Sequence, residues 1–316
     1  MKIRDKKILV IGSYNVGLAC KSERVPVWGE TLIGNDFSES NGGKGANQAV
    51  AASRLGGNVS FVGCLGNDRF GNDGIEMLQK ESVDISGIFR SEKHTGVGFI
   101  FLNLQGENCI LVAPGANNEL SSEDVLNSGK IEEADIIIFQ LENRLETVEV
   151  LMKEAKRLGK TVIFNPAPAN AEALKLLQYA SVVNPNESEL LILNGENPDS
   201  YLTLEKCEEL AYKLMEKGPK AIIVTRGSQG ALVVTKEKVT KIPSKKVNVI
   251  DTTGAGDSFT GALAVALSED KSIEESASFA NNVGAYSVTK RDVIPSLPKR
   301  SQLEAFLNDE IYDSIS

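Results

Sequence analysis

The sequence is poor in residues on which many catalytic mechanisms depend. Its one histidine, His94, stands in a charged stretch typical of a solvated turn, so we expect no mechanism built on imidazole. No apolar run approaches the length of a membrane span, and the first apolar run is too brief for a signal peptide. We therefore expect a soluble, cytoplasmic protein. The four cysteines lie far apart, without disulfide or zinc spacing: Cys20, Cys64, Cys109 and Cys207.

Positive charge is also in deficit. The 34 lysines and arginines stand against 43 acidic residues, and the net charge of −9 disfavours binding to nucleic acid or to an anionic membrane. Two nucleotide-binding fingerprints are missing as well. No glycine loop has Walker spacing, and no G-x-G-x-x-G pattern follows a strand, which disfavours a dehydrogenase on a doubly wound sheet.

Strand and helix patterns alternate along the 316 residues. They predict one α/β domain over residues 1–316, built on a doubly wound, mostly parallel sheet flanked by helices. Expected strands cover residues 7–11, 58–65, 134–141, 161–165, 181–184 and 221–225, with a hairpin at 231–235 and 238–242. Expected helices cover residues 48–55, 71–81, 146–158, 171–177, 188–194, 204–217, 258–267 and 273–288.

Two segments depart from this alternation. Residues 97–103 and 108–112 alternate like a β-hairpin, and residues 16–40 contain no helix pattern, with a strand and turn expected near 26–31. Together they predict a small β-sheet inserted at about 16–40 and 95–113, which would act as a lid. Its apolar residues, such as Phe99 and Phe101, are either lid core or the contacts of a homodimer.

The motif DTTGAGD at residues 251–257 is the main candidate for chemistry. Its two glycines allow a tight turn before a helix, and such a turn points backbone N–H groups at an anion. Asp257 is itself an anion, so it needs a task there. It is either a general base that takes a proton from an attacking hydroxyl, or only a helix cap.

A second glycine motif, NGGKGAN at residues 41–47, precedes a helix of small residues. Lys44 and Asn47 make it a polar cradle suited to hydroxyl groups, the alternative being a flexible turn. Asn15 and Glu142 follow the expected strands 7–11 and 134–141, at the sheet edge where ligands bind in such folds. Asn15 is either a substrate contact or a turn former.

Asn186 and Glu189 stand three residues apart where a helix is expected to begin. Their oxygen atoms suit Mg²⁺ held through water. The same spacing is equally typical of a capping box, so both interpretations remain open.

The two glycine motifs, in this order and with Asn186 and Glu189 between them, resemble those of the ribokinases, within the ribokinase-like (PfkB) family of carbohydrate kinases. The likeness runs from about residue 7 to 306. It implies an ATP-dependent kinase with Asp257 as the base and, as the anion hole, the amides of Gly254, Ala255 and Gly256. The implied sugar-binding residues, besides Asp257, are Asn15, Gly43, Lys44, Gly45, Asn47 and Glu142.

The resemblance also implies the cofactor sites. Magnesium would be held by Glu189, and K⁺ is the implied activator. The residues matching ATP-binding positions are Asn186, Thr225, Gly227, Ser228, Gly230, Gly256 and Asn281. Those matching a monovalent-cation site are Asp251, Thr253, Ser287, Lys290, Asp292 and Ser296.

Two positions depart from the family. Gly17 stands where these kinases have a sugar-gripping aspartate, and Asp292 stands where many have glycine. Because of Gly17, the resemblance supports a sugar kinase better than it supports ribose specifically. It implies phosphorylation of the primary hydroxyl of a pentose, with D-ribose to ribose 5-phosphate as the leading reaction. The alternatives are another small sugar, a deoxysugar, a phosphosugar or a nucleoside as substrate, or a sugar-sensing protein without catalysis.

Overall fold

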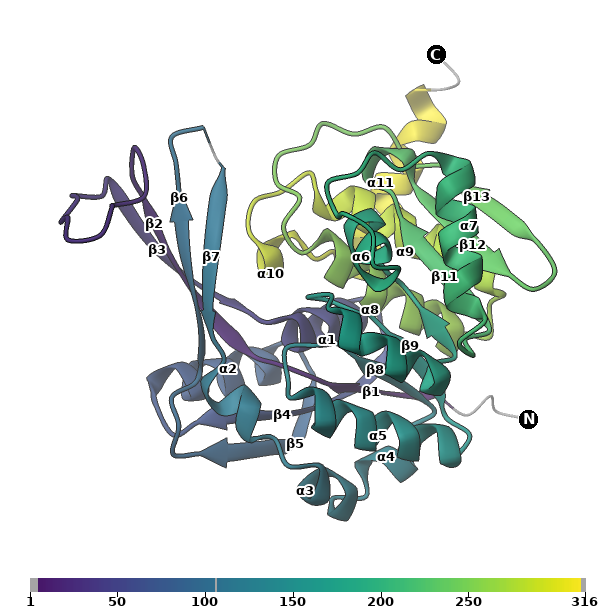
Figure 1. The fold of residues 1–316 in the computed structure, drawn as a ribbon, viewed down its shortest axis with the longest axis horizontal. Coiled ribbons are helices and arrows are strands. Elements are labelled where there is room, and N and C mark those ends of the chain that lie inside the picture. Colours follow the sequence, from purple (N-terminus) through teal and green to yellow (C-terminus); the bar gives the residue numbers. More distant parts are fainter. Residues whose placement is uncertain (1–4, 106, 314–316) are drawn as a thin grey trace.

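The computed structural model describes residues 5–105 and 107–313 (Figure 1). Its main sheet has the strand order β13-β12-β11-β10-β9-β8-β1-β4-β5. The strands from β5 to β11 in this order run parallel, while β12 and β13 pair antiparallel at one edge. The strands are β1 (Lys7–Ile11), β4 (Asn58–Gly66), β5 (Asp84–Ser91), β8 (Ile136–Phe139), β9 (Thr161–Phe164), β10 (Val182–Val183), β11 (Ala221–Thr225), β12 (Ala231–Thr235) and β13 (Val239–Ile242).

Helices cover both faces of this sheet, as the doubly wound prediction requires. Successive strand residues serve opposite faces: Ile8 belongs to one hydrophobic core and Leu9 to the other. The first core is covered by α1 (Lys44–Arg54), α2 (Arg69–Lys80), α8 (Ala255–Ser268), α9 (Ile273–Ser287), α10 (Val293–Ser296) and α11 (Arg300–Asp313). The second is covered by α3 (Ser122–Asn127), α4 (Lys130–Glu133), α5 (Leu145–Arg157), η2 (Ala171–Tyr179), α6 (Glu187–Leu193) and α7 (Leu204–Met215).

A separate four-stranded sheet confirms the predicted lid. Its order is β3-β2-β6-β7, and in Figure 1 it projects away from the main sheet. Its strands are β2 (Asn15–Lys21), β3 (Asp36–Gly42), β6 (Gly96–Leu102) and β7 (Asn108–Ala113). Gly106, in the predicted hairpin turn, lies outside the described residues. None of the described helices combines the length and apolar character that crossing a membrane requires.

Several predictions of local structure were wrong or incomplete, and helices α3, α4, α10 and α11 were not expected at all. Residues 26–31 contain the expected turn, at residues 28–29, but no strand, and the apolar side chains that suggested a strand are exposed there, with Trp28 fully so. Strand β5 was missed, because this edge strand is only partly buried and its apolar pattern is weak. Helices α1 and α8 begin three to four residues before the expected starts, which places Lys44 and Asp257 inside first turns.

Candidate active site

Asp257 lies in the first turn of α8, at the contact between α8 and α1. The helix begins after Gly254, whose φ of 77° is left-handed and whose added Cβ would lie 2.4 Å from Val293 Cγ1. Asp257 is 6% exposed. Its carboxylate accepts hydrogen bonds from Asn47 Nδ2 at 2.8 Å and from Gln48 Nε2 at 2.9 Å, and it makes no helix cap. The capping interpretation is therefore wrong, and the carboxylate faces α1.

The anion nest is predicted for the same first turn. The first N–H groups of any α-helix have no acceptor within the helix, and the helix dipole favours negative charge beside them. Nothing lies within 4 Å of the position that a Cβ on Gly256 would take, so there is room for a ligand against this backbone. The turn therefore offers space next to Asp257, although one of the three predicted amides, that of Ala255, donates to the Thr252 carbonyl at 3.3 Å in this structure.

The cradle at the start of α1 is built by close backbone packing. Gly43 has a φ of 90°, and its added Cβ would lie 2.6 Å from the backbone nitrogen of Asn15. A Cβ on Gly45 would lie equally close, 2.6 Å, to the nitrogen of Ser13. Both glycines are thus required where α1 rests on the chain leaving β1, and Lys44 is held in a helix, not in a flexible turn.

Glu142 collects the polar groups of this cradle. One of its oxygens, Oε2, accepts the backbone N–H of Lys44 at 2.9 Å and Asn15 Nδ2 at 3.3 Å. It also accepts the hydroxyl of Ser13. Asn15 is the first residue of β2, so its interpretation as a turn former is wrong. The structure therefore brings together the residues predicted to bind sugar.

Lys44 interacts electrostatically with the carboxylates of Asp257, Glu142 and Glu189. Burial of its ammonium works to lower its pKa. The negative charges of Asp257, Glu142 and Glu189 outweigh that effect and raise the pKa above its ordinary value. Lys44 therefore stays charged at neutral pH and can hold an anionic group at this point.

A cavity of about 850 Å³ opens on the other side of the nest. Its wall includes apolar side chains such as Val247, Val249 and Phe259. The lining contains every residue predicted to bind ATP: Asn186, Thr225, Gly227, Ser228, Gly230, Gly256 and Asn281. A cavity that combines apolar wall residues with a few polar side chains suits a nucleotide.

A smaller hollow of about 140 Å³ joins the two regions. Lys44, Glu189 and Asp257 all line it. Asn186 and Glu189 form the capping box, with Asn186 Oδ1 accepting the Glu189 N–H at 2.8 Å and Glu189 Oε2 accepting the Asn186 N–H at 2.8 Å. Burial raises the pKa of Glu189, although the Asn186 N–H and Lys44 oppose this shift. The capping interpretation is therefore confirmed, and the carboxylate also points into the hollow.

The residues predicted to bind a monovalent cation lie in the loop before α8, in the loop between α9 and α10, and at the C-terminal ends of α9 and α10. Asp251 accepts the N–H of Thr253 at 2.9 Å and that of Asp292 at 3.1 Å. Asp292 has a φ of 62°, a conformation that glycine adopts easily and other residues rarely. Ser287 lies in α9, Lys290 Nζ donates to Tyr286 Oη at 2.6 Å, and the Ser296 hydroxyl donates to the Val293 carbonyl at 2.7 Å.

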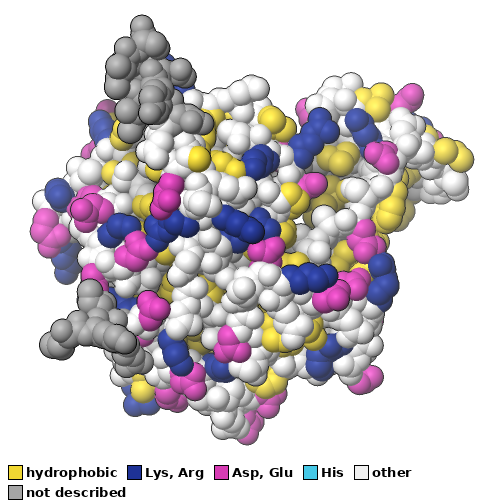
Figure 2. Space-filling model, turned by 180° about the vertical axis from the view of Figure 1, so that it is seen from behind, with side chains coloured by type: hydrophobic (Ala, Val, Ile, Leu, Met, Phe, Trp, Pro, Cys, Tyr) yellow, Lys and Arg dark blue, Asp and Glu magenta, His cyan; other side chains and the backbone are white. Residues whose placement is uncertain are grey.

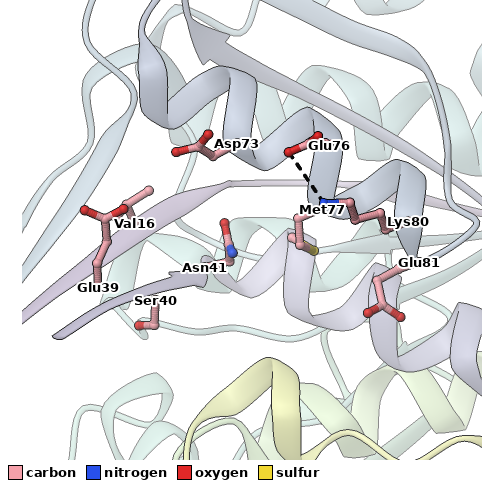
Figure 3. A pocket seen from close by; sticks show the side chains of 9 residues that line it. All are labelled: Val16, Glu39, Ser40, Asn41, Asp73, Glu76, Met77, Lys80 and Glu81. Atoms are coloured by element: carbon pink, nitrogen blue, oxygen red, sulfur yellow. Dashed lines mark ion pairs between the residues drawn. The ribbon is translucent and has the colours of Figure 1, made fainter.

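Another pocket, of about 340 Å³, lies between β3 and α2 (Figure 3). Its lining carries four carboxylates and one ammonium, and Lys80 pairs with Glu76 at 3.5 Å. No residue predicted for the site lines this pocket, and its negative charge would repel a phosphate. The nest, the cradle and the 850 Å³ cavity remain the candidate active site.

Sequence reasoning missed several buried amides around this site. Gln48, Asn117 and Asn165 all hydrogen-bond to residues that it predicted or to their neighbours. Gln48 directly follows the second glycine motif, which ends at Asn47, and this position next to the motif was the one available signal.

Comparison with known proteins tests the resemblance. The family described as "pfkB family carbohydrate kinase" matches residues 5–300. The chain belongs to the pfkB family of carbohydrate kinases. It is 37% identical over 304 residues to a ribokinase of Haemophilus influenzae, covering 96% of this chain and 98% of that one. It is 36% identical over 306 residues to a deoxyribokinase of Salmonella typhi, covering 95% and 98%.

A solved structure agrees with the fold of this pfkB-family kinase. The ribokinase of Arabidopsis thaliana, complexed with ribose and ATP, superposes with a TM-score of 0.87 at 31% identity, covering 96% of this chain and 98% of that one. The expectation of a ribokinase-like fold and of carbohydrate kinase activity is therefore confirmed. The non-catalytic and dehydrogenase alternatives are set aside.

Proposed function

We propose that this kinase transfers the γ-phosphoryl group of ATP to the primary hydroxyl of a pentose, with D-ribose to ribose 5-phosphate as the leading reaction. The single observation that carries this proposal is the place of Asp257. Its carboxylate stands between the polar cradle of α1 and the nest that borders the 850 Å³ cavity. Similarity to the Arabidopsis ribokinase, which was solved with ribose and ATP, supports the same pairing of ligands.

In this proposal Asp257 takes the proton of the sugar hydroxyl while that oxygen attacks the γ-phosphorus and ADP leaves. The amides of Gly254, Ala255 and Gly256 stabilise the charge on the transferring group. Lys44 adds a fixed positive charge beside the same hollow. Because the phosphoryl transition state is loose, positioning and electrostatics supply most of the rate, and the lid excludes water that would hydrolyse ATP.

The metal sites are part of the proposal. Glu189 would hold Mg²⁺ through water, and the capping box engages only its Oε2. Magnesium would neutralise phosphate charge when bound with ATP. For K⁺, backbone carbonyls of the two loops would serve with the Ser296 oxygen, which keeps lone pairs because its hydrogen goes to Val293. Potassium as an activator can be checked by replacing it with a large organic cation.

One observation favours a second candidate, a deoxysugar. Because Gly17 has no side chain, this lid position supplies no charged acceptor for a sugar hydroxyl, and a Cβ there would lie 2.9 Å from Ser40 Oγ and 3.1 Å from Ile100 Cδ1. A lost hydrogen bond to a charged group is worth roughly 1.5–3 kcal/mol, or about 10- to 150-fold in preference. The 36% identical deoxyribokinase shows that this substrate occurs among similar proteins.

A substrate panel tests the proposal. Coupled ADP release would be measured with D-ribose, 2-deoxy-D-ribose, other pentoses, a sugar phosphate and a nucleoside, and ³¹P NMR of the product would locate the phosphate. We expect a pentose to give the highest kcat/KM, with a phosphate ester at the primary hydroxyl. A clear preference for the nucleoside or the sugar phosphate would overturn the proposal.

We also infer a homodimer formed through the lid, and a cytoplasmic location, where ATP is plentiful. On the lid face opposite Asn15, β-sheet pairing places Leu18, Phe99 and Leu111 in one row. Phe99 is 43% and Leu111 67% exposed, and Figure 2 shows hydrophobic side chains along the projecting lid. Light scattering would check this, because Leu111→Glu would give monomers.

A further inference from the structure

Gln48 contacts the proposed base from the side away from solvent. It is 0% exposed, and its Nε2 donates to Asp257 Oδ1 at 2.9 Å. The other carboxylate oxygen, Oδ2, accepts Asn47 Nδ2 at 2.8 Å. Asn47 belongs to the proposed sugar site, whereas Gln48 has no predicted role. Each oxygen of the base therefore has one amide donor, and two donors together fix the rotation of the carboxylate.

The Gln48 amide is itself held in one orientation. Its Oε1 accepts Gln140 Nε2 at 2.6 Å, and its Nε2 also donates to Asn165 Oδ1 at 3.1 Å. Asn165 Oδ1 is identified as the acceptor because Asn165 Nδ2 donates to the Asn184 carbonyl at 3.1 Å. A flipped Gln48 amide would set oxygen against oxygen at Asn165 and Asp257, whose facing atoms are acceptors. Gln140 opposes the flip less, because its Oε1 has no partner among the described residues and its amide could turn as well. The donor to Asp257 is therefore fixed by its neighbours.

The same network reaches the anion nest. Asn184 Nδ2 donates to Thr260 Oγ1 at 2.7 Å, and Thr260 Oγ1 donates to the Gly256 carbonyl at 2.9 Å. The chain of amides thus connects the base to the turn that carries the nest. Its members are neutral amides and one hydroxyl, so its geometry does not depend on their ionisation.

We propose that Gln48 is a positioning residue, which holds the Asp257 carboxylate in the orientation that takes the proton from the sugar hydroxyl. This inference rests on the proposed function of Asp257. Without Gln48 the carboxylate keeps one donor, Asn47, and can rotate away from the hydroxyl. Substrate binding does not need that orientation of the carboxylate. Replacing Gln48 should therefore lower kcat and leave KM nearly unchanged.

The test replaces Gln48 with methionine, which keeps the length of the side chain and removes its amide. Initial rates of ADP release would be measured over full ranges of sugar and ATP. We expect kcat to fall about 10- to 100-fold, the size expected for a misplaced catalytic group, while KM for either substrate changes less than about threefold. Val50→Ala is the matched control, since Val50 is a 0% exposed core residue of the same helix. It should lower the melting temperature and leave kcat nearly unchanged.

A double variant separates positioning from general disruption. If Gln48 acts through Asp257, then Gln48→Met should not lower further the residual rate of Asp257→Asn. An equal loss of rate in that background would overturn the inference, as would a kcat of Gln48→Met that matches the Val50→Ala control. Gln140→Met removes the hydrogen bond to Gln48 Oε1 but leaves the Gln48 amide in place, so it should lower kcat less than Gln48→Met does. This variant replaces Gln48→Met in the test if Gln48→Met fails to fold. An absence of sugar-dependent ADP release in the unaltered protein would instead refute the proposed function.

Discussion

Asp257→Asn should abolish most catalysis while leaving the fold intact. The introduced amide has the shape of the carboxylate but cannot take a proton. Gln48 Nε2 also donates to Asn165 Oδ1, which keeps this nitrogen facing residue 257, so the new oxygen stays on its side and the new NH₂ faces Asn47. Asn47 Oδ1 is buried and has no hydrogen-bond partner among the described residues. An amide flip of Asn47 would present this oxygen to the new NH₂.

Asp257→Asn should affect stability much less than catalysis. Two hydrogen bonds to a charge become two neutral ones, so we expect a change of less than about 2 kcal/mol in the free energy of unfolding. Removal of the general base should lower kcat about 10²- to 10⁴-fold, or ~2.7–5.5 kcal/mol in the barrier. Asp257→Ala should lose the same activity but more stability, because the N–H groups of Asn47 and Gln48 then lack an acceptor, at roughly 1–3 kcal/mol each.

Urea unfolding and coupled ADP release at saturating substrates measure both quantities. If Asp257→Asn kept more than about half of the original kcat, a loss far below that expected for a general base, Asp257 would not be that base. If Asp257→Ala unfolded no more easily than Asp257→Asn, the hydrogen-bond argument would be wrong, whatever the rates.

Three further predictions follow from local geometry. Gly43→Ala should lower the free energy of unfolding in urea by ~1–3 kcal/mol and raise the KM for sugar. The reason is that an alanine there would have a φ of 90° and a Cβ 2.6 Å from Asn15 N. An unchanged KM for sugar would show that Gly43 is not part of the sugar site. Asn117 Nδ2 donates to Asn15 Oδ1 at 2.8 Å. The loss of this hydrogen bond in Asn117→Ala should cost ~1 kcal/mol in sugar binding and so raise the KM for sugar roughly 3- to 10-fold. The KM for ATP serves as the internal control and should stay unchanged. The hydrogen bond from Arg54 lowers the pKa of Glu81, so the stability from this pair is present above the unfolded pKa of about 4.3 and is lost as the pH falls through the folded value. Glu81→Gln should therefore lose less stability than the unaltered protein between pH 6 and pH 3 in acid unfolding curves; equal losses would contradict the shift.

The sequence predicted the buried parts of the fold better than its edges. Central strands such as β1 and β9 are continuous apolar runs, because both their faces are covered by helices. Strand β5 lies at an edge with partly exposed residues, so its pattern was too weak to identify. The loop at residues 26–31 shows the opposite error, since apolar side chains stood in an exposed segment. Apolar periodicity indicates which residues are buried. A prediction based on it is wrong where a strand is exposed or where an exposed loop contains apolar residues.

The helix starts at the site were predicted late for a related reason. Lys44 and Asp257 lie in first turns composed of glycine, alanine and polar residues, which form no stripe of large apolar side chains. Those turns are polar because a ligand-binding helix start keeps its N–H groups uncovered. The departure from periodicity is thus a consequence of the proposed function, and the glycine motifs were the better guide to these residues.

The role inferred for Gln48 depends on a contact that no local pattern contains. Successive helix residues point about 100° apart, so Asn47 and Gln48 can both reach one carboxylate only if it lies between their two directions. Gly261 makes this possible: it lies one turn after Asp257 on the same face of α8, and a Cβ there would be 2.7 Å from the carbonyl oxygen of Gln48. The absence of that Cβ lets the two helices approach until both amides reach Asp257. The geometry of the proposed base is therefore determined by a glycine four residues away and by two amides more than 200 residues away in the chain.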